Sequence, residues 1–198
     1  GGVAIGAGAS AWDDGVSIGV GTVSDPTGET PGSGGTVIGY QASAGVNQGN
    51  HQTVIGGLAR GLNTDVTAIG YRATATGLQS VAIGANATSD KTNAVAIGFT
   101  ANATGADSLA IGTNAAAKYA NSVAIGSGSS TATAASTATG FITNSAAPGA
   151  EVSVGTAAAQ RRITNVADGA AAQDAVTVAQ LSTSNSNIST SVSSLSTG

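Results

Sequence analysis

Val81-Ala82-Ile83-Gly84 opens a series of four nearly identical tetrapeptides, continued by Val95-Ala96-Ile97-Gly98, Leu109-Ala110-Ile111-Gly112 and Val123-Ala124-Ile125-Gly126. Their closing glycines lie 14 residues apart, and two looser copies before them keep the same spacing. The turn glycines of this series are Gly56, Gly70, Gly84, Gly98, Gly112 and Gly126. A fixed period of this length indicates stacked structural repeats.

Each regular coil is predicted to hold two short strands joined by tight corners. The first strand ends at the closing glycine, whose freedom to adopt positive φ suits a corner. The second strand alternates small and polar residues, as in Ala73-Thr74-Ala75 and Ala101-Asn102-Ala103, which is typical of a strand with one buried face. Fourteen residues are too few for a helical crossover between parallel strands. Equivalent strands must therefore stack from coil to coil, which predicts an all-β fold, a parallel β-solenoid.

The first strand of each coil is apolar on both faces. In Val81-Ala82-Ile83 the valine and the isoleucine point to one side and the alanine to the other. Leaving such a Val or Ile exposed costs roughly 1.5–3 kcal/mol, and a long exposed apolar stripe indicates an interface. Tight corners favour the alanines Ala82, Ala96, Ala110 and Ala124 inside the coil. The opposite side chains then face a partner chain: Val81, Ile83, Val95, Ile97, Leu109, Ile111, Val123 and Ile125. The reverse assignment, which places these residues in the core of the roll, also requires oligomerisation.

Two stretches break the period. Residues 20–35 lengthen one coil by six residues and residues 44–52 lengthen the next by three. The glycines and prolines of the first stretch predict a protruding loop. Gly140 keeps the 14-residue spacing, so we expect a weak further coil there, although its strand is reduced to Thr137-Ala138-Thr139. The predicted head covers residues 1–150.

The pattern changes after residue 150. Residues 151–176, a predicted neck, hold Arg162-Ile163-Thr164-Asn165-Val166-Ala167 and Asp174-Ala175-Val176. Residues 177–198 show the alternating spacing of three and four that is typical of a coiled coil. The seam residues are Val178, Leu181, Asn185, Ile188, Val192 and Leu195. Thr177 and Gln180 have the spacing of a capping box.

The surface of this predicted helix is rich in Ser, Thr and Asn. These residues are poor helix formers, so we expect the helix to persist only in a multi-stranded coiled coil. Asn185 is the polar residue of the seam and is expected to set its register, with the capacity to hold an ion on the axis. A solvated surface asparagine is the alternative interpretation.

The coils followed by Val152-Ser153-Val154-Gly155, the Arg162–Ala167 string and Gln180-Leu181 resemble the YadA-like head and neck of trimeric autotransporter adhesins from Gram-negative bacteria. The resemblance implies a homotrimer of left-handed parallel β-rolls, a neck and a coiled-coil stalk. It also implies exposure at the bacterial cell surface, outside the outer membrane in which the longer parent protein is anchored. The implied function is binding of host extracellular matrix or host-cell receptors, together with autoaggregation. A spacer segment, with binding located elsewhere in the parent protein, fits the same pattern.

The composition argues against several other classes of protein. A net charge of −4 disfavours a nucleic-acid partner, and the absence of cysteine excludes disulfides and thiol chemistry. The chain has no apolar run of the roughly 18 residues that a membrane-spanning helix needs. The seven acidic residues of the head lie scattered, so a solenoid enzyme is a remote alternative. No cofactor or metal is predicted, since adjacent Asp13 and Asp14 cannot supply the roughly six to eight oxygens that Ca²⁺ takes.

Recognition is expected in residues 1–72, which hold both insertions. Binding anchors are enriched in Trp, Tyr and Arg, and loops on a rigid scaffold often carry recognition. The candidate ligand surface comprises Trp12, Tyr40, His51, Arg60, Tyr71 and Arg72. In the neck, Arg161 and Arg162 are expected to pair with Asp168 or Asp174 of a neighbouring chain, near Asn165 of the same string.

Overall fold

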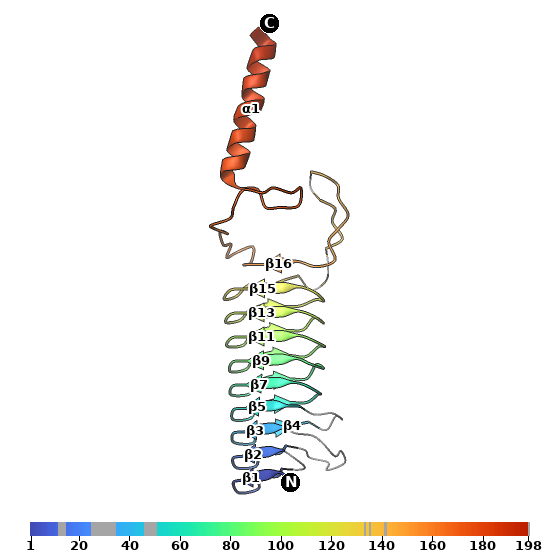
Figure 1. The fold of residues 1–198 in the computed structure, drawn as a ribbon, viewed down its shortest axis with the longest axis vertical. Helices are drawn as coiled ribbons and strands as arrows, with labels where there is room; N and C mark the ends of the chain where they lie inside the picture. The colour runs from blue at the N-terminus through green and yellow to red at the C-terminus, as the bar shows by residue number, and fades with distance from the viewer. Residues whose placement is uncertain are drawn as a thin grey trace. The chain divides into compact units, whose positions relative to one another are not determined.

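The computed structural model describes residues 1–11, 15–24, 35–45, 51–132, 134, 136–140 and 142–197. The chain divides into two compact units, residues 1–160 and residues 161–198. The first unit is a parallel β-solenoid, in which one coil stacks on the next along the chain (Figure 1). This architecture confirms the predicted fold class.

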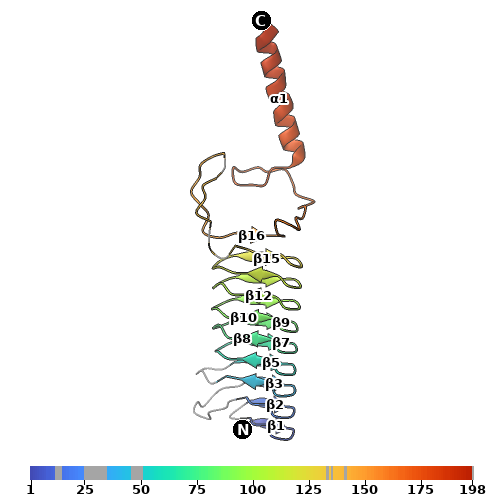
Figure 2. The ribbon, with the colours of Figure 1, turned by 180° about the vertical axis from the view of Figure 1, so that it is seen from behind.

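Two sheets form the walls of the solenoid. The ten-stranded sheet, here called the long sheet, contains β1 (Val3–Ile5), β2 (Val16–Ile18), β3 (Thr36–Ile38), β5 (Thr53–Ile55), β7 (Thr67–Ile69), β9 (Val81–Ile83), β11 (Val95–Ile97), β13 (Leu109–Ile111), β15 (Val123–Ile125) and β16 (Val152–Ser153). The six-stranded sheet, here called the short sheet, contains β4 (Ser43–Ala44), β6 (Arg60–Gly61), β8 (Thr74–Ala75), β10 (Thr88–Ser89), β12 (Asn102–Ala103) and β14 (Ala116–Ala117). Both sheets are parallel, and the view from behind shows strands of the short sheet beside those of the long one (Figure 2).

The core of the solenoid consists mostly of small side chains. Most strands of the long sheet are fully buried at the central residue and half-buried at the two outer ones, as in β9 and β13. Ala82, Ala96, Ala110 and Ala124 all have 0% exposure. The inward placement of these four alanines is therefore confirmed.

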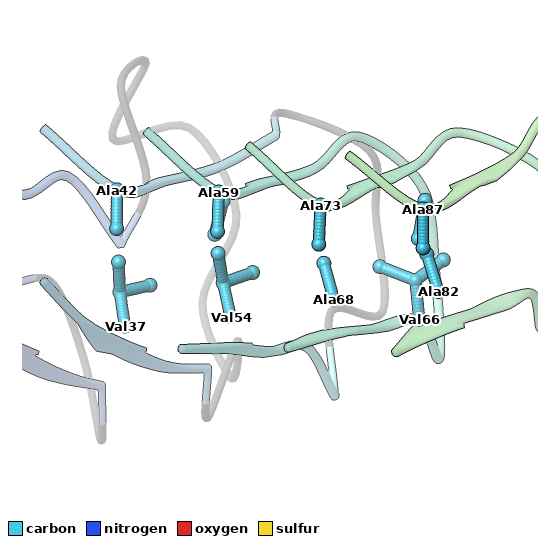
Figure 3. Packing of buried hydrophobic residues seen from close by; sticks show 11 residues of the cluster. Val37, Ala42, Val54, Ala59, Val66, Ala68, Ala73, Ala82 and Ala87 are labelled. Atoms are coloured by element: carbon cyan, nitrogen blue, oxygen red, sulfur yellow. The ribbon is translucent and has the colours of Figure 1, made fainter. Parts of the chain in front are cut away.

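Larger core residues are matched by smaller ones in the opposite sheet. Val37 and Val54 reach across the roll toward Ala42 and Ala59 (Figure 3). A Cβ added to Gly61 would lie 2.7 Å from a methyl of Val54. The two sheets therefore lie too close together for large residues on both sides.

The closing glycines are required by the stacking of the coils. Gly98 has a φ of 135°, a conformation that L side chains rarely adopt. A Cβ at Gly98 would also lie 2.6 Å from the carbonyl carbon of Gly112 in the next coil. The 14-residue glycine period thus marks a place where the backbones of consecutive coils approach closely.

The structure corrects the boundaries of both insertions. Val23 forms parallel bridges with Ser10 and Ser43, so residues 20–24 continue the regular coil. At the second insertion, Ala44 lies in β4 and buried Gln52 immediately precedes β5. The extra residues are thus confined to shorter stretches, most of which lie outside the described residues.

The predicted coil at Gly140 is wrong. Residues 136–140 are not in a strand, and β15 pairs directly with β16, with Val123 opposite Val152. The reason lies in the outward side chains: Val152 continues the apolar row beside Val123, whereas Thr137 and Thr139 put hydroxyls at both outward positions. Strands that begin with threonine, such as β5 and β7, keep an isoleucine at the second outward position. The side chains, and not the spacing of one glycine, decide which segment stacks on β15.

The second unit contains one helix, α1 (Val178–Thr197). The backbone N–H of Gln180 donates to the Thr177 hydroxyl, and the Gln180 side chain accepts from the Thr177 N–H, both at 3.2 Å. These bonds confirm the predicted capping box. The Gln180 amide also exchanges two hydrogen bonds with the backbone of Gly169, which holds the preceding segment against the start of the helix.

Candidate ligand surface

One corner of the solenoid carries a row of exposed aromatic side chains. Each residue of this corner directly follows a closing glycine. Its backbone carbonyl accepts a hydrogen bond from the next coil, as the Gly57 carbonyl does from the Arg72 N–H at 2.9 Å. Tyr40, Tyr71 and Phe99 occupy alternate coils and are 57%, 52% and 54% exposed. These three residues are called the aromatic row below.

Small residues separate the members of the aromatic row. Gly57 lies between Tyr40 and Tyr71, and Ala85 lies between Tyr71 and Phe99. A Cβ on Gly57 would touch the Tyr71 ring at 3.6 Å, so that ring leans over the neighbouring coil. The small residues therefore leave room beside the rings, and the Tyr71 ring uses it.

Next to the aromatic row lies an open groove of about 480 Å³, lined by Gln41, Ser43, Leu58, Arg60, Arg72 and Thr74. It spans three coils on the outer side of the short sheet, where Ser43 pairs with Arg60 and Arg60 with Thr74. The guanidinium of Arg72 lies over the Tyr71 ring, 5.7 Å from its centroid. This contact is a cation–π interaction that joins the groove to the aromatic row.

Three residues of the groove adopt left-handed backbone conformations. Gln41, Leu58 and Arg72 have φ values of 49°, 60° and 56°. The equivalent position in later coils is filled by Asn86, Thr100 and Asn114, and asparagine is a residue type that tolerates this conformation. The groove thus presents long side chains where the turn itself would favour asparagine or glycine.

The opposite corner carries a ladder of polar residues. His51 Nδ1 lies 2.9 Å from a carboxylate oxygen of Asp65. Asp65 is 14 residues further along the chain, in the next coil. Two coils beyond, the Asn93 amide donates to Asp107 at 2.8 Å. His51 is therefore an exposed member of an ordered ladder, on the other side of the coil from Arg72.

The predicted ligand residues do not all come together. Tyr40, Arg60, Tyr71 and Arg72 gather around one corner, whereas His51 lies at the other. Trp12 falls outside the described residues. Tyr119, the remaining tyrosine, is only 8% exposed and forms part of the core.

In the neck, the predicted acidic residues bond within their own chain. Asp168 accepts a hydrogen bond from the Thr177 hydroxyl at 2.6 Å. Asp174 accepts from the backbone N–H groups of Ala171 and Ala170, and these two bonds lower its pKa below the ordinary value of 3.8. Pairing of Arg161 or Arg162 with either carboxylate of a neighbouring chain stays a prediction. Asn165 has a left-handed φ of 60° and lines an apolar hollow with Ile163 and Val166.

The seam residues of α1 are exposed in the single chain. Val178, Leu181, Ile188, Val192 and Leu195 are between 59% and 86% exposed, and Asn185 is exposed beside them. Within the described part of the chain, no helix has the length and apolar character to cross a membrane, and no three metal-ligating side chains form a cluster.

Two family models and a solved structure match the repeats and the helix described above. The model of the YadA head domain repeat matches residues 67–87 and 89–115, and the model of the coiled stalk of trimeric autotransporter adhesin matches residues 162–198. The crystal structure of the collagen-binding domain of the Yersinia adhesin YadA superposes with a TM-score of 0.69 and 27% identity, covering 87% of this chain and 83% of that one.

The head repeats and the stalk of this chain are those of the YadA-like trimeric autotransporter adhesins. The chain is an adhesin-type surface domain, and its fold is that of an adhesin head. The C-terminal YadA-like domain of a Burkholderia pseudomallei protein is 36% identical over 48% of this chain and 50% of that one, with a TM-score of 0.40. No curated protein sequence matches the chain.

Sequence reasoning missed part of the groove in this YadA-like head. Gln41, Ser43, Leu58 and Thr74 had no motif of their own, and only the register of the coils brings them beside Arg60. One signal was available: the second residue after each closing glycine is Asn or Thr in three regular coils but the longer Gln41, Leu58 or Arg72 in three consecutive earlier ones. This run of long side chains marks the groove.

Proposed function

We propose that this chain is the head and first part of the stalk of a homotrimeric adhesin. In this proposal the adhesin is exposed at the bacterial surface, outside the outer membrane, and binds a fibrous host matrix protein of the collagen type. The likeness to a collagen-binding domain over most of the chain supports this choice of ligand. The single observation that carries the proposal is the aromatic row.

The long sheet supplies the surface for trimer formation. Its outward Val, Leu and Ile side chains stay partly exposed in the single chain, with Ile97 and Ile125 at 36% and 43%. The outward residues of the short sheet are mainly polar, for example Thr74, Thr88 and Asn102. Because a long exposed apolar stripe marks an interface, the long sheets of three chains are proposed to meet at the trimer axis.

The second unit offers the same kind of uncovered surface. Its hollow is lined by Ile163, Val166 and Val176, among others, and Val176 is 68% exposed. Together with the exposed seam of α1, this hollow has the apolar character of an interface between chains.

The aromatic row fits an extended proline-rich ligand. Adjacent strands lie about 4.8 Å apart, so residues on alternate coils are separated by about 9.6 Å. A polyproline II chain, as in each strand of collagen, repeats every three residues or about 9.3 Å. Proline-rich chains are recognised by aromatic-lined surfaces. Successive rings of Tyr40, Tyr71 and Phe99 are thus spaced to meet equivalent residues of one collagen strand.

The test is binding of the whole chain to immobilised triple-helical collagen peptide, followed by surface plasmon resonance. Replacing Tyr40, Tyr71 and Phe99 together by alanine is expected to weaken binding at least tenfold, because aromatic anchors of this kind are worth about 2 kcal/mol or more each. Thr113→Ala, at the same corner on a later coil, is the matched control. Unchanged binding in the triple variant overturns the proposed site, and no binding by the native trimer favours the spacer interpretation.

The two insertions are a second part of the proposal. The insertions are proposed to add ligand contacts of their own, three times around the trimer axis, which favours avidity. Shortening residues 25–34 to a Gly-Ser link and removing three residues within 46–50 is expected to weaken ligand binding while the trimer persists. Equal binding by native and shortened chains would show that the insertions are passive.

A further inference from the structure

We propose that the groove beside the aromatic row is a separate binding site for a sulfated polysaccharide. The site is made by Arg60 and Arg72 with Gln41, Ser43, Leu58 and Thr74. This inference does not depend on collagen binding, because it concerns another surface and another ligand chemistry.

The first argument is the concentration of positive charge. The chain carries only six Lys and Arg against ten Asp and Glu, and two of the cations line this one groove. Across the described residues, no carboxylate forms an ion pair with Arg60 or Arg72. Arginine presents a planar fork of donors that matches the oxygen atoms of sulfate, phosphate and carboxylate groups. The groove therefore favours a ligand with repeated negative charges.

The second argument is the backbone conformation of the groove residues. Left-handed conformations are unfavourable for residues other than Gly, Asn and Asp. The coils adopt one at this corner, and the later coils place Asn86, Thr100 and Asn114 there. The groove instead places the longer side chains of Gln41, Leu58 and Arg72 on three consecutive coils. Because strained positions are concentrated at binding and catalytic sites, this run of long side chains supports a role in binding.

The third argument separates a polysaccharide from an acidic peptide. The strands beneath the groove are already paired on both sides, β6 with β4 and with β8, so a peptide cannot bind here by adding a strand. Only Leu58 among the lining residues is aliphatic, which leaves few apolar anchors for peptide side chains. Ser43, Thr74 and Gln41 instead offer hydroxyl and amide groups, which suit the many hydroxyls of a sugar chain.

The groove also stays available in the proposed trimer. It lies on the outer side of the short sheet, whereas the apolar stripe lies on the outer side of the long sheet. Three copies of the groove would surround the axis, and a long polyanion could contact more than one of them. Weak individual contacts would then combine through avidity.

The test uses heparin as the probe and the whole chain as the protein, with affinity measured by titration calorimetry at two salt concentrations. The native chain is expected to bind, more weakly at higher salt because exposed charges are screened. Arg60→Gln with Arg72→Gln is expected to reduce affinity at least tenfold. Lys91→Gln with Lys118→Gln, which removes the same charge from exposed sites outside the groove, is expected to change it less than twofold.

Two further variants keep the proposal falsifiable. Ser43→Glu puts a carboxylate beside Arg60 without removing either arginine, and it is expected to weaken heparin binding by a similar factor. Arg60→Lys with Arg72→Lys keeps the charge but loses the fork, and an intermediate affinity is expected. Circular dichroism and the oligomeric mass identify any variant that fails to fold.

Several outcomes would overturn the proposal. If the Lys91→Gln, Lys118→Gln variant lost as much heparin affinity as the Arg60→Gln, Arg72→Gln variant, only net charge would matter. Binding of chemically desulfated heparin as tightly as heparin would exclude sulfate recognition. Binding of poly-glutamate without binding of heparin would assign the groove to acidic peptides. By contrast, loss of collagen binding in the aromatic triple variant, with heparin binding kept, would support two separate sites.

Discussion

The coils of residues 1–160 and the helix α1 bury their apolar residues in different ways. The solenoid has an internal core of its own, in which Ala82, Ala96 and Ala110 have 0% exposure, and only one outer face remains apolar. The helix has no internal core, and Leu181 and Leu195 are 64% and 83% exposed. A single chain therefore stabilises the inside of the solenoid by itself but leaves the helix seam in water.

This difference shows what each region requires from its neighbours. Small inward residues and closing glycines specify the coil within one chain. The outward Val and Ile of the long sheet are buried only when other chains cover them. In α1 the polar surface is rich in Ser and Thr, which favour the helix only weakly. We therefore expect the solenoid to retain structure under conditions that melt the stalk.

The largest expected effect comes from a charge on the interface face of the solenoid. Ile97→Asp buries a carboxylate at the proposed trimer axis, which costs several kcal/mol in every chain, so the trimer should dissociate or fail to form. Asn102→Asp on the short sheet is the control, since exposed substitutions usually change stability by within about 0.5 kcal/mol. Thermal melting and oligomeric mass measure both, and equal melting temperatures would contradict the assigned interface.

The stalk can be weakened without touching the solenoid. Leu181→Ala removes a seam side chain and is expected to cost roughly 2–5 kcal/mol per chain if that side chain is buried in a coiled coil. The helical circular dichroism signal should melt earlier while the strand signal changes little. Thr183→Ala, away from the seam, is the control. If Leu181→Ala left the helical transition unchanged, the seam would not be an interface.

The inside of the solenoid can be tested through its glycines. Gly98→Ala forces a side chain into a φ of 135° and against the carbonyl carbon of Gly112, for which we expect a loss of about 3 kcal/mol. Gly128→Ala meets nothing within 4 Å, at a φ of 69°, and should cost about 1 kcal/mol. Chemical denaturation compares the two. Similar losses for both would show that backbone conformation alone, and not stacking, requires the glycines.

The smallest expected effect is a pH dependence of the neck. The pKa of Asp174 is lowered by hydrogen bonds from the N–H groups of Ala171 and Ala170. The stabilisation is therefore complete above the ordinary value of 3.8 and is lost as the pH falls through the lowered pKa. Amide hydrogen exchange at Ala170 and Ala171, corrected for intrinsic pH dependence, should show protection that falls in that acidic range. Asp174→Asn should abolish the dependence, and a pH-independent profile in the native chain would refute the role of these bonds.

The sequence was sufficient to predict the features that repeat. The two strands of each coil, the inward alanines and the capping box at Thr177 follow from local periodicity, because each coil repeats the same physical constraints. The Gly140 coil failed because one glycine at the right spacing cannot replace the outward apolar side chains that Val152 supplies.

The groove could not be predicted from any one segment. Its residues come from three coils, and an insertion changes the spacing between the first two, so Gln41 and Leu58 are 17 residues apart while Leu58 and Arg72 are 14 apart. Only the register of the stacked strands aligns them. The run of long side chains at this corner was visible in the sequence, but its meaning depends on the left-handed backbone that the structure shows.

The most direct test of the central claim, that the apolar face and the seam are interfaces between copies of this chain, is the mass of the purified chain in solution. Sedimentation equilibrium at micromolar concentration is expected to give a single species of three times 18.5 kDa. A stable, folded species of 18.5 kDa with intact helical signal would contradict it.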